Sequence, residues 1–280
     1  MFNKKRLIAL LTGTLLVGSL VSGCGSAGAN STPGSSSSKI TVSGSTSVGP
    51  TMEILAEDYQ KENDTTTIEV QQVGSSAGIT NTIDGTSQIG MSSRDLKDEE
   101  KSELKEYQIA IDGIAVITNS ANKVKDLTLD QVKDIYTGKI TNWKEVGGND
   151  ADIVVVSRED GSGTRDGFQE IVGFESGDLT SNAQISDGSG NIKTTVQGNE
   201  NAIGYISFGY LDDSINSVKI GGVEPKEENV YNKKYPISRP FLLVTKGDAT
   251  GDAKSFIDYV LSDDGQKTIE KEGFMSVNQK

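Results

Sequence analysis

Short apolar runs alternate with segments of helical spacing along most of the chain, and polar turns separate them. The runs 39–42, 68–73 and 88–91 each have the length and residue types of a buried strand. Helical spacing of apolar residues follows the first run at 51–62 and resumes after the second run at Ile79. This order of strand, turn and helix predicts an α/β fold with a largely parallel sheet.

The same alternation continues to the end of the chain. It predicts further strands at 109–117, 153–156, 202–208 and 240–245, and further helices at 98–107, 127–136, 168–172, 253–261 and 264–272. We expect the single tryptophan, Trp143, to lie in the core, because burial is the usual fate of an aromatic side chain.

The turn after the strand at 153–156 has the chemistry of an anion site. Glycines in this turn free backbone N–H groups at the positive end of the following helix, and Ser162 and Thr164 add hydroxyl donors. Arg158 adds a planar guanidinium with several N–H donors. The pattern favours a tetrahedral oxyanion as the ligand.

Similar turns follow two other predicted strands. Residues 43–47 follow the strand at 39–42, and residues 74–78 follow the strand at 68–73. Ligands of open parallel sheets bind beyond the carboxyl ends of the strands, where such turns converge. We therefore expect one shared anion site. The segment 186–191 has the same residue types, but we favour a plain turn there.

Composition limits the chemistry of that site. The chain has no histidine and one cysteine, Cys24, so a Ser-His-Asp triad, imidazole metal ligands and an internal disulfide are all excluded. Ser47 or Ser162 could be imagined as a nucleophile, but no base lies nearby in the sequence. The formal net charge of −13 argues against nucleic acid as a partner. We expect a binding protein without catalytic residues, cofactor or metal.

The N-terminus predicts export and a lipid anchor. A basic start at 4–6 and an apolar run at 7–20 precede Val-Ser-Gly-Cys, which ends at Cys24 and resembles a bacterial lipobox. The resemblance implies a signal peptide at 1–23 and a lipidated Cys24 outside the cytoplasm, anchored to the cell membrane. A transmembrane anchor is the alternative. Residues 24–38 hold no large apolar residue, so we expect a flexible tether.

Several motifs together resemble one family, the phosphate-binding lipoproteins of the bacterial Pst phosphate ABC transporter (the PstS family). The matching segments occur in order along the chain at 44–50, 74–78, 92–94, 136–143, 158–164 and 202–207. The resemblance implies a receptor that captures inorganic phosphate and delivers it to the membrane permease subunits of a phosphate ABC transporter. It implies no enzymatic activity. We expect a monomer.

The resemblance also implies the two-lobed type II periplasmic-binding-protein fold, an α/β fold with two interlobe crossings. We place the crossings near 114–119 and 235–240. Lobe one then comprises 39–115 with 236–280, and lobe two comprises 116–235. Phosphate would bridge the lobes and stabilise the closed form.

The family's ligand positions map onto residues of both lobes. By resemblance, the phosphate ligands are Thr46, Ser47, Ser75, Arg158, Ser162, Gly163 and Thr164. Arg165 and Asp166, next to them, could be a solvated pair or could orient the ligand-binding groups.

One position departs from the family. Ser93 stands where well-studied members carry an aspartate that accepts the phosphate proton and so excludes sulfate. Asp112 is our candidate replacement, because a carboxylate in an apolar strand requires a partner, and Arg94 could supply it. Asp95 is the competing acceptor, and Asp112 could also be only a turn residue. We include Ser93, Arg94 and Asp112 among the phosphate-binding candidates. Another oxyanion, such as sulfate or molybdate, is the alternative ligand.

Overall fold

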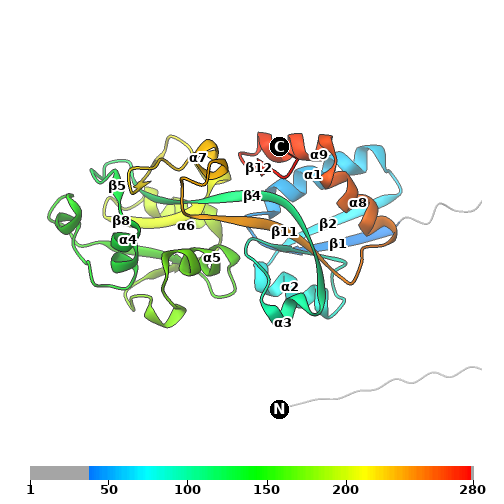
Figure 1. Ribbon diagram of the computed structural model, residues 1–280, viewed down its shortest axis with the longest axis horizontal. Helices are drawn as coiled ribbons and strands as arrows, with labels where there is room; N and C mark the ends of the chain where they lie inside the picture. The colour runs from blue at the N-terminus through cyan, green and yellow to red at the C-terminus, as the bar shows by residue number, and fades with distance from the viewer. Residues whose placement is uncertain (1–37, 279–280) are drawn as a thin grey trace, which may run out of the picture. The chain divides into compact units, whose positions relative to one another are not determined.

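Two long strands, β4 (Leu104–Asn119) and β11 (Ser238–Lys246), connect the two halves of one sheet (Figure 1). The computed structural model describes residues 38–278. The two strands pair antiparallel along the whole of β11, with a register shift between Phe241 and Leu242. Along the sheet the strand order is β2-β1-β3-β11-β4-β8-β6-β7.

The first half of the sheet holds the strands that the apolar runs predict. Its elements are β1 (Ser38–Gly44), α1 (Gly49–Glu62), β2 (Thr66–Gln72), α2 (Ser75–Ile83), β3 (Ile89–Ser92), α3 (Asp98–Lys101), α8 (Gly251–Leu261), α9 (Asp263–Lys271) and β12 (Met275–Ser276). Strand β1 pairs parallel with both β2 and β3. Helices α1 and α8 bury apolar faces against this half, with Met52, Leu55 and Phe256 in one core cluster.

The second half is built in the same way. Its elements are β5 (Asp126–Leu127), α4 (Leu129–Tyr136), η1 (Trp143–Val146), β6 (Val154–Arg158), α5 (Gly163–Val172), η2 (Ser176–Asp178), β7 (Gln184–Ser186), α6 (Gly188–Gln197), β8 (Ala202–Ser207), η3 (Phe208–Tyr210), β9 (Ile215–Ser217), β10 (Lys219–Ile220) and α7 (Glu227–Tyr231). Its core contains the Phe168 and Tyr205 rings, which stack with centroids 4.0 Å apart. Trp143 lies in this core and is 1% exposed, as we expected.

The core changes partway along β4 and at the start of β11. On β4, Ala110 packs in the first cluster and Ile114 in the second. Ile237, the residue before β11, belongs to the second cluster, and Phe241 on β11 belongs to the first. Each half therefore has its own hydrophobic core, and we call them lobe one (the half with α1) and lobe two (the half with α5).

Two local predictions were wrong. The helix expected at 98–107 ends at Lys101, and Tyr107 lies in β4 opposite Leu243 of β11. As a strand, this segment forms backbone hydrogen bonds with β11. A short, highly charged helix in its place would leave this edge of β11 unpaired. The segment 186–191 does not form a plain turn, because α6 begins within it at Gly188.

Asp112 on β4 forms a buried ion pair, but with Arg239 on β11 rather than with the expected Arg94. Its Oδ2 atom accepts hydrogen bonds from Nε and Nη2 of Arg239 at 3.2 and 2.9 Å, and Oδ1 accepts the N–H of Phe208 at 3.1 Å. The two side chains of the pair are 0% and 2% exposed. Burial raises the pKa of the Asp112 carboxyl, and the charge of Arg239 opposes that rise.

Replacing Asp112 with asparagine is expected to lower the free energy of unfolding by about 3–5 kcal/mol. The change leaves the buried Arg239 guanidinium without an anionic partner. The amide oxygen of asparagine can still accept the hydrogen bond from the N–H of Phe208. Urea denaturation measures this effect, and phosphate and sulfate titrations of the same variant test the proposed proton acceptor. A variant as stable as the parent protein would contradict the structural role of the pair.

The predicted signal peptide, Cys24 and most of the tether lie outside the described residues. Across 38–278, no helix combines the length and the apolar character that a membrane crossing requires.

Candidate functional site

The carboxyl ends of β1, β2 and β3 are connected by backbone hydrogen bonds that bring their turns together. The N–H of Ser45 donates to the carbonyl of Met91 at 2.9 Å, and the N–H of Gly74 donates to the carbonyl of Gly44 at 2.9 Å. Gly44 has φ of +145°, and a Cβ atom there would lie 2.2 Å from the Met91 carbonyl oxygen. This close approach requires glycine.

Three serines from these turns form a buried hydroxyl cluster. Ser45 donates from Oγ to Oγ of Ser93 at 2.8 Å, and Oγ of Ser93 lies 3.3 Å from Oγ of Ser75. The N–H of Ser93 also donates to Ser75 Oγ at 3.2 Å. Ser93, the position that departs from the family pattern, therefore lies among groups that can both donate and accept hydrogen bonds.

The turn of lobe two is held by partners on both sides. Arg158, at the end of β6, is 1% exposed, and its N–H donates to the Tyr205 hydroxyl at 3.2 Å. Its Nε and Nη2 atoms each donate to the carboxylate of Glu159 at 2.7 Å. Ser162 caps α5 by accepting the N–H of Arg165. Hydrogen bonds within the chain therefore fix the orientation of the guanidinium without a ligand.

Direct contacts join the turns of the two lobes. Arg158 donates from Nη2 to Thr46 Oγ1 at 2.9 Å, and the hydroxyls of Ser47 and Thr164 lie 2.8 Å apart. The N–H of Ser76 donates to the carbonyl of Gly161 at 3.1 Å. Besides Ser93, the structure thus brings together these predicted ligands: Thr46, Ser47, Ser75, Arg158, Ser162, Gly163 and Thr164.

Unsatisfied donors at this meeting point favour an anion. Among the described residues, Nη1 of Arg158 and Oγ of Ser189 are buried and have no hydrogen-bond partner within the chain. The first turns of α1 and α2 have no side-chain cap, and both helices direct the positive ends of their dipoles toward the turns at this meeting point. A buried guanidinium N–H is costly unless an acceptor meets it.

Ser189 is a further candidate residue that our sequence analysis did not single out. It lies in the first turn of α6, whose N-cap Asp187 makes no side-chain cap. The adjacent Gly188 lies close to Thr46, since a Cβ atom at Gly188 would be 3.8 Å from Thr46 Oγ1. The signal was present in the Gly and Ser content of 186–191, for which we favoured a turn.

Arg94 occupies an ion-pair network rather than the hydroxyl cluster. Its Nη1 and Nη2 atoms donate to Glu100 at 2.7 and 2.8 Å, and Nε donates to Asp166 of lobe two at 3.0 Å. Every nitrogen of its guanidinium already donates, so Arg94 resembles an interlobe contact more than a ligand; its role in phosphate binding stays a prediction. Asp95, the competing acceptor, is exposed. Asp166 pairs with Arg94 and not with Arg165, which donates to Asp160.

Replacing Glu100 with glutamine is expected to lower the free energy of unfolding by about 1 kcal/mol at pH 7. Burial alone would raise the pKa of Glu100, but the hydrogen bonds and charge of Arg94 hold that pKa below its ordinary value. A carboxyl shifted downward stabilises the fold above its unfolded-state pKa of about 4.3, and the stabilisation is lost as pH falls through the folded-state pKa. The variant and the parent should therefore differ less at pH 3 than at pH 7 in urea denaturation.

A matched control is Glu106→Gln, at an exposed position on β4. We expect little change in stability from it at either pH. Equal effects of the two variants would contradict a special role for Glu100.

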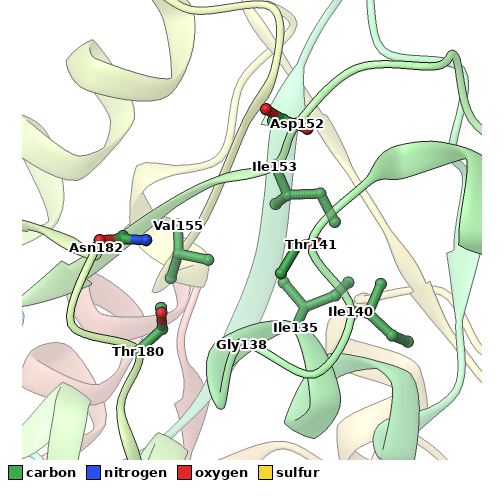
Figure 2. Close-up of a pocket in the computed structure, with 9 residues that line it drawn as sticks. All are labelled: Ile135, Gly138, Ile140, Thr141, Asp152, Ile153, Val155, Thr180 and Asn182. Atoms are coloured by element: carbon green, nitrogen blue, oxygen red, sulfur yellow. The ribbon is translucent and has the colours of Figure 1, made fainter.

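A separate cavity of about 220 Å³ lies in lobe two. Figure 2 shows its lining residues, which are Ile135, Gly138, Ile140, Thr141, Asp152, Ile153, Val155, Thr180 and Asn182. None of them is a predicted anion ligand, and none carries a positive charge. Asp152 would repel an anion, so this cavity does not suit the predicted ligand.

The fold and the site define a solute-binding protein of the type II periplasmic-binding-protein class. In agreement, the family model of the PBP superfamily domain matches residues 29–264 of this chain. The chain belongs to the PstS family of phosphate-binding proteins. It is 37% identical over 279 residues to the phosphate-binding protein PstS of Bacillus subtilis (strain 168), covering 95% of this chain and 91% of that protein.

Solved structures give the same result. A substrate-binding protein assigned to a phosphate ABC transporter of Clostridium perfringens, crystallised with bound phosphate, has a TM-score of 0.84 and 64% identity. The match covers 86% of this chain and 100% of that one. An ABC-type phosphate transport receptor from Vibrio cholerae has a TM-score of 0.75 and 39% identity, over 85% of this chain and 100% of that one.

Proposed function

We propose that this protein captures one inorganic phosphate ion between the turns of its two lobes. The buried and unpartnered Nη1 atom of Arg158 carries this proposal, because an oxyanion at that point would satisfy it. Hydroxyls from both lobes meet in the same group of turns, and the names of the relatives support phosphate as the ion.

The proposed phosphate ligands differ in the kind of hydrogen-bond donor that they provide. Arg158 donates from its guanidinium, and Thr46, Ser47, Ser75, Ser93, Ser162 and Thr164 donate from hydroxyl or backbone groups, with Gly163 donating from its N–H. The lobes then follow our predicted bounds, 39–115 with 236–280 and 116–235, and an ion that contacts both stabilises the closed form. The separate cores along β4 and β11 support a division close to these bounds, although Ile114 and Ile237 pack in the core of lobe two.

The delivery step is also part of the proposal. The phosphate-loaded receptor docks on the permease subunits of an ABC transporter, outside the cytoplasm, and acts as a monomer. A lipid on Cys24 anchors it to the cell membrane through the tether at 24–38. Support comes from the lipobox-like sequence and from relatives named for phosphate ABC transport.

A different oxyanion is the second candidate, and Ser93 is the observation that favours it. A hydroxyl can accept the proton of phosphate, but it can equally donate to fully ionised sulfate. An aspartate would repel sulfate, so its replacement by serine weakens the expected basis for selectivity.

Calorimetric titration of residues 36–280, which form one compact unit, tests both candidates. Ligand-free protein is titrated with phosphate and then, separately, with sulfate at neutral pH. One-to-one phosphate binding without sulfate binding supports the proposal. Sulfate binding of equal affinity would establish the broader oxyanion receptor, and no binding of either ion would refute both.

A further inference from the structure

Tyr210 of lobe two reaches the anion-binding turn of lobe one. Its hydroxyl donates a hydrogen bond to the backbone carbonyl of Thr46 at 3.1 Å. Tyr210 lies in η3 and packs against the core of lobe two, whereas Thr46 follows β1 in lobe one. The bond therefore joins the lobes directly beside the predicted ligands.

This contact differs in kind from its neighbours. The other contacts to this turn from lobe two use side chains of predicted ligands, namely Arg158 to Thr46 Oγ1 and Thr164 to Ser47 Oγ. The same side chains are proposed to bind the anion. A carbonyl oxygen carries partial negative charge and repels an anion, so the bond from Tyr210 does not compete with the ligand.

The same bond orients the peptide that offers a donor. The carbonyl of Thr46 and the N–H of Ser47 belong to one planar peptide unit and point in opposite directions. Fixing the carbonyl toward Tyr210 therefore fixes the direction of the Ser47 N–H, which in this structure donates to Ser45 Oγ at 3.2 Å. It also holds the repulsive oxygen in a hydrogen bond.

The position of Tyr210 is itself fixed by contacts of η3 to the Asp112–Arg239 pair and to α6. Residue Phe208, at the start of η3, donates its N–H to Asp112, the buried partner of Arg239. The Tyr210 ring lies against the first turn of α6, since a Cβ atom at Gly190 would be 3.8 Å from Tyr210 Cε1. Burial raises the pKa of Tyr210, so its hydroxyl stays protonated at neutral pH.

We infer that Tyr210 is a positioning residue that locks the closed, phosphate-loaded form by holding the Thr46–Ser47 peptide across the lobes. The inference rests on the proposed function. Because the bond forms only when the lobes meet, its loss should speed phosphate release and leave capture by the open form unchanged.

The test is Tyr210→Phe, which removes the hydroxyl and keeps the ring. In the full mature chain, radiolabelled phosphate is bound and then chased with excess unlabelled phosphate to measure release. We expect release to be about fivefold faster, the effect of one lost hydrogen bond, with the association rate changed less than twofold. The melting temperature of the ligand-free protein should stay the same. If the hydroxyl served only the stability of the fold, its removal would lower that temperature.

Tyr259→Phe is the matched control, because this tyrosine lies on α8 against Tyr59, in lobe one. It should leave both rates unchanged. Release from Tyr210→Phe at the parent rate, or a lower melting temperature for the ligand-free variant, would overturn the inference. If the parent protein binds no labelled phosphate, the proposed function itself fails, which is a distinct outcome.

Discussion

Replacing Arg158 with lysine is expected to weaken phosphate binding at least about 100-fold. The guanidinium holds Glu159 and Thr46 with two of its nitrogens and leaves Nη1 for the ligand. Lysine keeps the positive charge but concentrates it in one ammonium group, which cannot meet all three partners in that geometry. Losing two charge-assisted hydrogen bonds of about 1.5–3 kcal/mol each accounts for the size of the effect. Calorimetric titration with phosphate measures it.

Lysine is chosen so that Glu159 keeps a cationic neighbour. The carboxylate of Glu159 also accepts the N–H of Gly188 at 3.4 Å. Burial raises the pKa of Glu159, but the hydrogen bonds and charge of Arg158 hold that pKa below its ordinary value. Urea denaturation of the ligand-free variant separates lost binding from lost folding. Binding within threefold of the parent value, in a variant of normal stability, would show that Arg158 is not a ligand.

Replacing Gly163 with alanine is expected to weaken phosphate binding about 10- to 100-fold while both lobes stay folded. A Cβ atom at this position would lie 2.3 Å from Ser75 Oγ and 2.8 Å from Ser93 Oγ, both in the other lobe. The backbone of Gly163 is not left-handed, so alanine fits α5 itself. The obstruction therefore acts only when the lobes approach, and overpacking of this kind costs about 1–3 kcal/mol.

Gly177→Ala is the matched control for this prediction. A Cβ atom at Gly177, in η2 of lobe two, would have no neighbour within 4 Å. Calorimetry should show parent-like affinity for this control and a large loss for Gly163→Ala, with both melting temperatures near that of the parent. Equal affinities for the two variants would mean that the lobes do not approach each other at Gly163 when phosphate binds.

Much of the site could be predicted because its information is local. Glycine and hydroxyl residues after an apolar run produce a turn with free N–H groups whatever the rest of the chain does. The turn at 158–164 was found in this way, and so were the turns at 43–47 and 74–78. The same local reasoning failed at 98–107, where charge and helical spacing favoured a helix, but pairing with β11 gave a strand from Leu104.

The sequence by itself determined the residue types available: hydroxyls, glycines and a few arginines, with no histidine to act as a base. Only the tertiary structure decided which of them meet. Asp112 lies opposite Arg239 because β4 and β11 are adjacent and in that register, although the two residues are 127 positions apart. Arg94 instead meets Glu100 and Asp166. Partner choice depends on strand order and register, which are properties of the whole sheet and not of any local segment.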